Sequence, residues 1–404
     1  MAPKTLLVLA ASAYQLEAIA AARALGLRIV TVDNRPDNPG HRFADACHHA
    51  STVDREAILA IARREEIAGI LAPCTDVAIP TLAYVAERLG LPGPSAAAAE
   101  ICCDKTAFRR FQRESGLPHP QYVSLRPDAT VPAIDFSRPW IVKPDRSSGS
   151  KGVFILKSPA ELEKRLEESR SFSPTGTVVL EQFLPGAQGT MEGILADGSI
   201  RWSMSFDRET APPPFAATKS HRTPSRFSPA VIADLRRQLE TMWGALGVSS
   251  GPFDCDFVAT EAGAVILEAS PRLGGNGISK LIKAAANFDL PAYAVRHAMG
   301  EAGDIPSEGV GAPAAVYLFG AESSGRLRYS EREAETLRHE PWMRELRFDY
   351  PVGTAVPAFQ NGQCRVGAMI LEAASRDELD ARIDLVRRRL DVRAEPAAEG
   401  DAAA

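Results

Sequence analysis

The sequence predicts a mixed chain, α/β and α+β, in three parts: an N-terminal doubly wound parallel α/β domain, a central α+β domain and a β-rich C-terminal domain. Strand and helix patterns alternate over residues 6–92, and strand–turn–strand patterns dominate from about residue 140 to 271. Further β-rich segments and one amphipathic helix follow residue 300. The 404 residues are enough for two or three hydrophobic cores.

The first part has the spacing of β-α-β units. Leu6–Leu9 and Ile29–Val32 are expected strands, and the Gln15–Leu25 helix between them ends at Gly26. A helix capped by Asp54, a strand at 67–72 and a helix at 79–89 are expected next. The opening apolar run is similar to the core of a signal peptide, but the β-α-β spacing favours a buried first strand. Ligands of such domains bind at the carboxyl ends of the strands.

The later parts have fewer regular units. Helices are expected at 105–115, 159–168 and 229–246, and strands at 314–319 and 363–371. The final helix, Arg376–Leu390, carries its apolar residues on one face. The tail from Arg393 is rich in Ala, Glu and Pro, and we expect it to be disordered.

Charge and cysteine content limit the partners and the compartment. The 46 Lys and Arg residues against 51 Asp and Glu leave a net charge of -5, so there is no general excess of positive charge to bind nucleic acid or an anionic membrane. No apolar stretch approaches the roughly 18 residues that a membrane span needs. The six cysteines form no Cys-x-x-Cys pair, which is typical of reduced thiols. We therefore expect a cytoplasmic protein with no nucleic-acid or membrane partner.

A loop of small residues follows an apolar strand that ends at Lys143-Pro144. This phosphate loop, residues 145–152, contains three serines and two glycines and is followed by a second short strand. Small residues let backbone N–H groups approach phosphate oxygens, while Lys143 and Lys151 add positive charge. The pattern is not a Walker A loop, because no Gly-Lys-Ser/Thr precedes a helix. The alternative is a surface hairpin with solvated lysines.

Two carboxylate-bearing strands are joined through residues 260–263 and form what we call the carboxylate hairpin, residues 251–270. If the hairpin is symmetric about its turn, Asp256 lies opposite Glu268 and Asp254 lies opposite Ser270 on one face. Opposed carboxylates repel, and a divalent cation between them relieves the repulsion. An all-oxygen set of this kind suits Mg²⁺.

Arg272 and a glycine-rich run with Asn276 follow the hairpin directly. A guanidinium is suited to the charge that develops on a transferring phosphoryl group. Two alternatives stay open at this stage. The acids face water and pair with Arg272, or Asp254 and Asp256 form the Asp-x-Asp site of a glycosyltransferase that uses nucleotide sugars.

The order of these motifs resembles the ATP-grasp superfamily, specifically its carboxylate-amine ligase branch, which includes biotin carboxylase and D-alanine:D-alanine ligase. The motifs are the Asp104-Lys105 entry, the phosphate loop, the segment Val178–Gly186, which we call the hinge, and the carboxylate hairpin. The resemblance covers nearly the whole chain. It implies an N-terminal domain at 1–103, an ATP-grasp domain at 104–300 with a mobile nucleotide lid at about 135–185, a C-terminal domain at 301–392 and a disordered tail at 393–404.

The resemblance also implies roles for individual residues. The ATP-binding residues would be Lys105, Lys143, Ser147, Ser148, Gly149, Ser150, Gly152, Glu181, Gln182, Phe183, Leu184 and Gln188. Glu181 and the backbone of residues 182–184 would bond the adenine edge. Asp256, Glu268 and Ser270 would hold Mg²⁺, with Mn²⁺ as an alternative. Arg272 and Lys143 would be catalytic, and His221, Arg272 and Asn276 would contact substrate.

This chain departs from the family pattern at two positions. Gln188 stands where the family usually has a Glu for the ribose hydroxyls, and Ser270 stands where an Asn commonly completes the metal site. Gln188 can still donate and accept hydrogen bonds, but these bonds lack the strength that a charged carboxylate gives. The Ser270 hydroxyl can ligate Mg²⁺ directly or through water, so weaker metal binding, and not its loss, is expected. The first strand also lacks the Gly-x-Gly-x-x-Gly of dinucleotide dehydrogenases, which argues against that class.

The resemblance implies an ATP-dependent ligase of small-molecule carboxylates and amines. It would form an amide or dipeptide-like bond through an acyl phosphate, release ADP and phosphate, and use an amino acid as one substrate. The alternatives are a carboxylase that uses bicarbonate and, because of Gln188 and Ser270, a degenerate nucleotide-binding regulatory protein. Related enzymes are often dimers, so a homodimer is an expectation.

Overall fold

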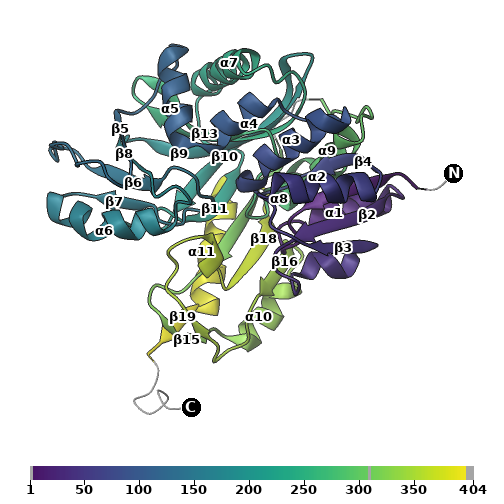
Figure 1. Ribbon diagram of the computed structural model, residues 1–404. Helices are drawn as coiled ribbons and strands as arrows, with labels where there is room; N and C mark the ends of the chain where they lie inside the picture. Colours follow the sequence, from purple (N-terminus) through teal and green to yellow (C-terminus); the bar gives the residue numbers. More distant parts are fainter. Residues whose placement is uncertain (1–2, 308–310, 397–404) are drawn as a thin grey trace, which may run out of the picture.

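The computed structural model describes residues 3–307 and 311–396 of the chain (Figure 1). The N-terminal part forms a parallel sheet, and the central and C-terminal parts together form a large antiparallel sheet. The predicted mixed fold class is therefore confirmed. In the part of the chain that the structure describes, no helix is both long enough and apolar enough to cross a membrane.

The N-terminal sheet has four parallel strands in the order β3-β2-β1-β4. They are β1 (Thr5–Leu9), β2 (Arg28–Asp33), β3 (Ala46–His49) and β4 (Ile67–Leu71). The helices around them are α1 (Leu16–Ala24), η1 (Pro39–Phe43), α2 (Arg55–Arg64), η2 (Asp76–Ala78) and α3 (Ile79–Leu89). Every residue of β1 is buried, as expected of a central strand of a parallel sheet. The loops after β1 and β4 open toward the middle of the molecule.

The central sheet has eight strands in the order β13-β12-β9-β10-β11-β14-β18-β16. They are β9 (Ala187–Ala196), β10 (Ser199–Thr210), β11 (Thr218–Thr223), β12 (Gly251–Thr260), β13 (Gly263–Ser270), β14 (Ala314–Phe319), β16 (Met343–Phe348) and β18 (Gly367–Glu372). Helices α7 (Pro229–Ala245), α8 (Ile278–Ala286) and α9 (Leu290–Ala298) pack against it. The strands expected in a separate C-terminal domain continue this sheet, because β14 pairs with β11.

A smaller sheet, which we call the lid sheet, has the order β5-β8-β6-β7 and projects from the molecule at the left of Figure 1. Its strands are β5 (Tyr122–Leu125), β6 (Trp140–Pro144), β7 (Phe154–Leu156) and β8 (Val178–Gln182), and α6 (Pro159–Ser171) covers one face. The hairpin predicted around the phosphate loop is present as β6 and β7. Helices α4 (Ala96–Cys103) and α5 (Lys105–Glu114) connect this region to the N-terminal sheet.

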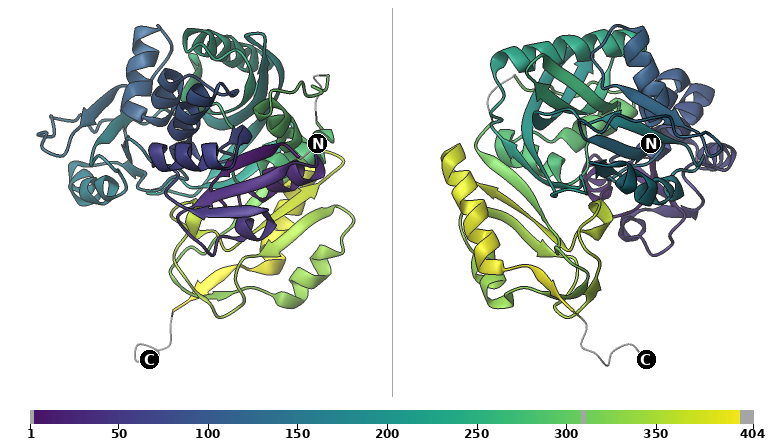
Figure 2. Two further views of the ribbon diagram at one scale, coloured as in Figure 1. Left: turned by 45° about the vertical axis from the view of Figure 1, so that its right-hand side comes forward. Right: turned by 90° about the vertical axis from the view of Figure 1, so that its left-hand side faces the viewer.

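The C-terminal region adds α10 (Glu331–Arg338) and α11 (Arg376–Leu390), with β15 (Gly325–Arg328), β17 (Ala355–Val356), β19 (Arg393–Glu395) and η3 (Gly362–Cys364). Figure 2 shows α11 along the outer side of this region. Its apolar stripe is buried, as predicted. The tail was expected to be disordered from Arg393, but residues 393–395 form β19 and pair with β15; residues 397–404 lie outside the described residues.

Candidate nucleotide and substrate site

The site is a cleft in which the lid sheet, the central sheet and the N-terminal loops meet. A nucleotide cavity of about 110 Å³ lies between the phosphate loop and the carboxylate hairpin. A cleft cavity of about 320 Å³ adjoins it and reaches the loops after β1 and β4. The two cavities share Arg208, Asp256, Glu268 and part of the phosphate loop in their walls. They therefore form one continuous space.

The carboxylate hairpin has the predicted register. Asp256 pairs with Glu268 and Asp254 pairs with Ser270 across β12 and β13. Strand β9 extends both rows, with Thr190 opposite Asp256 and Glu192 opposite Asp254. Alternation along the strands puts both rows on one face of the sheet. The floor of the cleft is therefore rich in carboxylates.

Cations beside this floor set the ionisation of the two facing carboxylates. Burial raises the pKa of Asp256 to about 6, while Arg208, 3.1 Å from its Oδ2, pulls it back and the neighbouring acids push it up. Burial also acts to raise the pKa of Glu268, but Lys105, 3.8 Å away, overcomes it and holds that pKa below its usual value. Two opposed carboxylates with water access fit one divalent cation that keeps several waters.

The three metal ligands that the resemblance implied stay a prediction, and the structure places two of them in the cavity walls. Among residues 3–307 and 311–396, no cluster of three or more His, Cys, Asp or Glu side chains has the geometry to hold a metal. Ser270 is buried beside Asp76. Burial acts to raise the pKa of Asp76, but Arg272 and Ser270 together lower it below its usual value. The structure thus gathers Asp256 and Glu268 at the cavities and places Ser270 behind them.

The phosphate loop closes over the nucleotide cavity. The Lys105 ammonium donates to the Ser147 carbonyl at 3.0 Å, and the Gly362 N–H donates to the Gly149 carbonyl at 3.0 Å. Lys143 lies in the cavity wall, 2.8 Å from Glu181. Burial lowers the pKa of Lys143 to about 8, and Glu181 opposes that shift. Lys143 is therefore still mostly charged at neutral pH.

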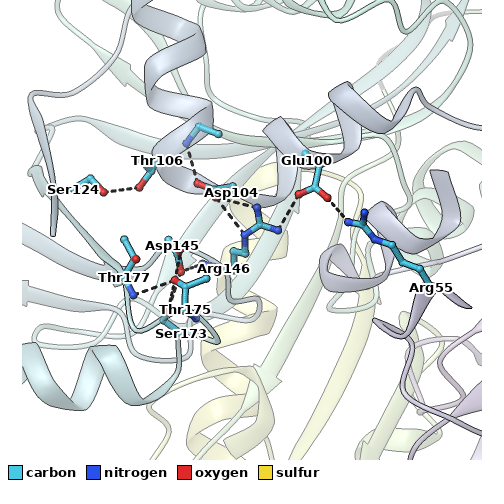
Figure 3. A network of polar contacts seen from close by, with 11 residues as sticks. Arg55, Glu100, Asp104, Thr106, Ser124, Asp145, Arg146, Ser173, Thr175 and Thr177 are labelled. Carbon is cyan, nitrogen blue, oxygen red and sulfur yellow. Dashed lines mark hydrogen bonds and ion pairs between the residues drawn. The ribbon is translucent and has the colours of Figure 1, made fainter. Parts of the chain in front are cut away.

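An ion network ties this loop to the connecting helices (Figure 3). Arg146 pairs with Glu100 of α4 at 2.9 Å and with Asp104, the N-cap of α5, at 3.1 Å. Glu100 also pairs with Arg55 of α2. Asp145 accepts from the Arg146 N–H at 2.7 Å and from two hydroxyls of the segment before β8. The base of the phosphate loop is therefore anchored on both sides.

Arg272 joins the central sheet to the N-terminal sheet. Its guanidinium lies 2.7 Å from Asp76, in the loop after β4, and also pairs with Asp254. Both acids help to raise the pKa of Arg272 well above its usual value although burial opposes them, so it stays charged. The side chain lines the cleft cavity next to Gly275 and Asn276. The Arg272 guanidinium is therefore a fixed positive charge in the wall of the cleft, and it would stabilise an anion that forms there during a reaction.

Comparisons with known proteins agree with this geometry. Residues 136–280 match the model of the ATP-grasp domain, 19–93 that of the ATP-grasp N-terminal domain, and 318–395 that of the L-amino acid ligase C-terminal domain 2. The chain belongs to the ATP-grasp superfamily. ATP-grasp enzymes use ATP and Mg²⁺, and the lysine-lined cavity with two opposed carboxylates fits both.

Three similar proteins illustrate the range. The uncharacterized protein y4rH of Sinorhizobium fredii is 28% identical over 311 residues; the match covers 75% of this chain and 63% of y4rH. An L-amino acid ligase from Bacillus licheniformis superposes with a TM-score of 0.80 at 18% identity, covering 98% of this chain and 99% of that one. The biotin carboxylase domain of a Hydrogenobacter thermophilus 2-oxoglutarate carboxylase was solved with MgADP, ADP and bicarbonate. It superposes with a TM-score of 0.72 at 16% identity, covering 96% of this chain and 90% of that one. The two solved structures show the fold.

The hinge of this ATP-grasp chain has several of its polar groups bonded within the protein. Glu181 lines the nucleotide cavity, and its carboxylate is held by Arg109 and Lys143, each at 2.8 Å. The Gln182 and Phe183 N–H groups donate at 2.9 Å to the carbonyls of residues 121 and 139. Two of the backbone groups expected to bond adenine therefore already bond to the protein. Gln188 lies in the nucleotide cavity with Arg208 3.5 Å from its Oε1.

His221 lies in the site, but its basic neighbours do not. His221 lines the cleft cavity, 3.1 Å from Thr190 Oγ1, and burial together with Arg208 lowers its pKa to about 3. It is therefore neutral and cannot supply positive charge. Two cations of the same strand lie elsewhere: Lys219 lines a separate outer cavity and Arg222 pairs with Asp380 at 3.1 Å. Arg222 directly follows His221 and therefore points to the opposite face of the sheet. Lys219 lies at a register shift in the pairing of β10 with β11, which interrupts the alternation.

Sequence reasoning missed several residues of the site. Arg208 on β10 reaches both cavities, Asp76 holds Arg272, and Arg109 holds Glu181. Asp76 could have been found, because it follows β4 and ligands bind at the carboxyl ends of parallel strands. Arg208 and Arg109 carried no such signal, since each pairs with a residue on a distant segment.

Gly274 allows a close approach that one methyl group would prevent. Glu192 is fully buried, and burial and Asp254 raise its pKa well above the usual range. A Cβ on Gly274 would lie 1.7 Å from Glu192 Oε1, whereas a Cβ on Gly275 would meet nothing closer than 4.0 Å. We expect Gly274→Ala to cost about 1–3 kcal/mol of stability and to lower turnover by displacing Arg272.

Gly275→Ala is the matched control for the stability part of this prediction and should unfold close to wild type. Thermal unfolding and ADP release of the two variants check the prediction. Equal behaviour of the two alanines would contradict the close approach at Gly274.

Proposed function

We propose that this chain is an ATP-dependent carboxylate-amine ligase that forms an amide or dipeptide-like bond. One substrate carboxylate attacks the γ-phosphorus of ATP and gives an acyl phosphate and ADP. The amine of the second substrate then attacks the acyl carbon, the C–N bond forms, and phosphate leaves. We propose that at least one of the two substrates is an amino acid.

The observation that carries this proposal is the C-terminal region. Residues 318–395 match the L-amino acid ligase C-terminal domain 2, and this region supplies part of the cavity walls. Gly362 and Gln363 line the cleft cavity, and Glu345, Arg347 and Arg365 line a further cavity beside it. The part of the chain that resembles amino-acid ligases is therefore also a part that would touch the substrates.

The residues of the cleft have the properties that this chemistry needs. Lys105 and Lys143 offer positive charge in the nucleotide cavity, and the backbone N–H groups of the phosphate loop can cradle phosphates. When bound by Asp256 and Glu268, Mg²⁺ would neutralise phosphate charge. Arg272 would stabilise the charge on the acyl phosphate and the oxygens around it. The chemistry needs no protein nucleophile, because positioning and electrostatics supply the rate.

Closure over the cleft supports the same chemistry. The phosphate loop bonds to Gly362 of the C-terminal region and Ser150 Oγ donates to the Ala216 carbonyl at 3.4 Å, so the loop bridges both sides of the cleft. Such closure protects an acyl phosphate from hydrolysis by water.

The test is an ADP- and phosphate-release assay over amino acids, supplied singly and in pairs, with bicarbonate in separate wells. We expect release that requires Mg²⁺ and is highest with particular pairs, with a dipeptide detected by mass spectrometry. EDTA should abolish it. Glu268→Gln should raise the Mg²⁺ concentration needed for half-maximal rate, whereas Glu261→Gln, on the exposed turn of the same hairpin, should not.

The other outcomes identify the alternatives. Release of ADP and phosphate with bicarbonate as the only added substrate would show that the chain is a carboxylase and not a carboxylate-amine ligase. Release of AMP and pyrophosphate would contradict the acyl-phosphate mechanism. No release with any substrate would favour a nucleotide-binding regulatory role.

A further inference from the structure

A third cavity lies next to the reacting centre and has no role in the chemistry described above. This side cavity has a volume of about 210 Å³ and is enclosed by α1, the loop at 273–277, α8, β14, β16 and β18. It shares Tyr14, Cys74, Gly275 and Asn276 with the cleft cavity. A substrate whose carboxylate lies at Arg272 would therefore extend into the side cavity.

The walls of the side cavity are mostly apolar. Leu273, Val316, Leu318 and Ile370 line it, and each is almost fully buried. These aliphatic surfaces suit a chain of methylene groups, which gain from leaving water. These aliphatic surfaces offer no hydrogen bond and no opposite charge to a polar group at the end of such a chain.

Glu17 is the carboxylate left without a partner in this cavity. It lies in the first turn of α1, is partly buried and lines the cavity. Among the described residues, Glu17 makes no hydrogen bond and no ion pair within 4.0 Å. A partly buried carboxylate without a partner is costly unless a ligand neutralises it.

The cations that line the same cavity are already paired. Lys280 bonds to Glu345, Arg347 contacts Glu345 and Asp349, and Arg365 lies 3.0 Å from Asp349. Arg365 also stacks over the Tyr14 ring at 5.1 Å. These three cations share the two carboxylates Glu345 and Asp349, and Glu17 is the remaining acid of the cavity, to which a cationic chain end would pair.

We infer that the side cavity binds the side chain of an amino-acid substrate that ends in an ammonium or guanidinium group, with Glu17 as its counter-ion. The aliphatic walls hold the methylenes and Glu17 receives the charged end. This inference rests on the proposed function for the placement of the reacting carboxylate. The direct binding measurement below does not depend on turnover.

The ionisation of Glu17 predicts how binding depends on pH. Burial raises the pKa of Glu17 to about 7, while Lys280 on α8 and Arg347 on β16 oppose the shift and Glu345 and Asp289 add to it. The carboxylate gains its charge as pH rises through this value, whereas a lysine side chain stays protonated to a pKa of about 10.4. Affinity for L-lysine should therefore rise between pH 6 and pH 8.

The test is calorimetric titration of the full chain, with saturating MgADP, against L-lysine, L-norleucine and L-2-aminoadipate. These probes share a chain length and end in a cation, a methyl and a carboxylate. We expect L-lysine to bind best. Glu17→Gln should weaken L-lysine by about tenfold or more, as loss of a charged hydrogen bond does, leave L-norleucine unchanged and flatten the pH dependence.

Glu87→Gln is the matched control, because Glu87 lies on the exposed side of α3 outside the cavity. It should bind like wild type. Equal binding of L-lysine and L-norleucine, preference for L-2-aminoadipate, no detectable L-lysine binding, or a Glu17→Gln affinity within twofold of wild type would each overturn the inference.

The two proposals can fail separately. Glu17-dependent L-lysine binding with no ADP release from any pair would remove the ligase proposal and keep the cation site. ADP release from neutral amino acids, without any effect of Glu17→Gln on L-lysine binding, would remove the cation site and keep the ligase.

Discussion

Replacing Arg272 with alanine is expected to lower kcat by about 10³-fold, which is the scale found when one charge-stabilising donor is removed from an active site. Arg272 lines the cleft cavity, whereas the nucleotide cavity is lined by Lys105 and Lys143. The Kd for ATP should therefore change only slightly. Steady-state ADP release and direct nucleotide titration separate the two quantities.

The controls for this prediction address the structural part of Arg272. Its removal leaves Asp76 and Asp254 without their cation, so thermal unfolding must be measured for each variant. Arg272→Lys keeps the charge but loses the two-pronged geometry, and it should fall between wild type and Arg272→Ala in kcat. A folded Arg272→Ala variant with wild-type turnover would contradict the role of Arg272.

Arg109→Ala is expected to destabilise the chain by about 3 kcal/mol, the lower end of the cost of breaking a buried ion pair, because Lys143 remains beside Glu181. Arg109 is fully buried, and its Nε and Nη2 donate to the Glu181 carboxylate at 2.8 and 3.2 Å. It also donates to the Leu267 carbonyl at 2.7 Å. Urea denaturation followed by tryptophan fluorescence measures the loss.

The neighbouring residue is the matched control for Arg109. Arg110 is exposed on the same helix, so Arg110→Ala should leave stability near wild type. The single variant Glu181→Gln and the double variant Arg109→Ala/Glu181→Gln complete a double-mutant cycle, which measures the coupling of the pair because Lys143 loses its carboxylate in both. Equal stability of the two single alanine variants would contradict a structural role for the buried pair.

Much of the local structure follows from the sequence pattern. Periodicity predicted α3, β14 and α11 at the bounds that the structure has, because a buried face repeats at fixed intervals along each element. The facing pairs Asp256 with Glu268 and Asp254 with Ser270 were also predicted, although a register shift between Asp256 and Phe257, and not symmetry about the turn, produces them. These features depend on residues close together in the chain.

Other features of the site depend on distant segments. The resemblance implied that Glu181 bonds the adenine edge, and the structure adds its ion pair with Arg109, 72 residues away. The boundary near residue 300 stays a prediction, and β14, which follows it, pairs with β11 of the central sheet. Nothing in a local pattern indicates such partners, because they are chosen by packing between elements.

The sequence by itself determined the fold class, the ATP-grasp resemblance and the facing pair Asp256 and Glu268, because each depends on local patterns and on the order of motifs along the chain. Only the tertiary structure decided that Arg272 is held by Asp76, 196 residues before it, that Arg208 reaches the same floor, and that Glu17 faces an apolar cavity without a partner. Packing brings these side chains together across three parts of the fold, and their charge environment exists only after that packing.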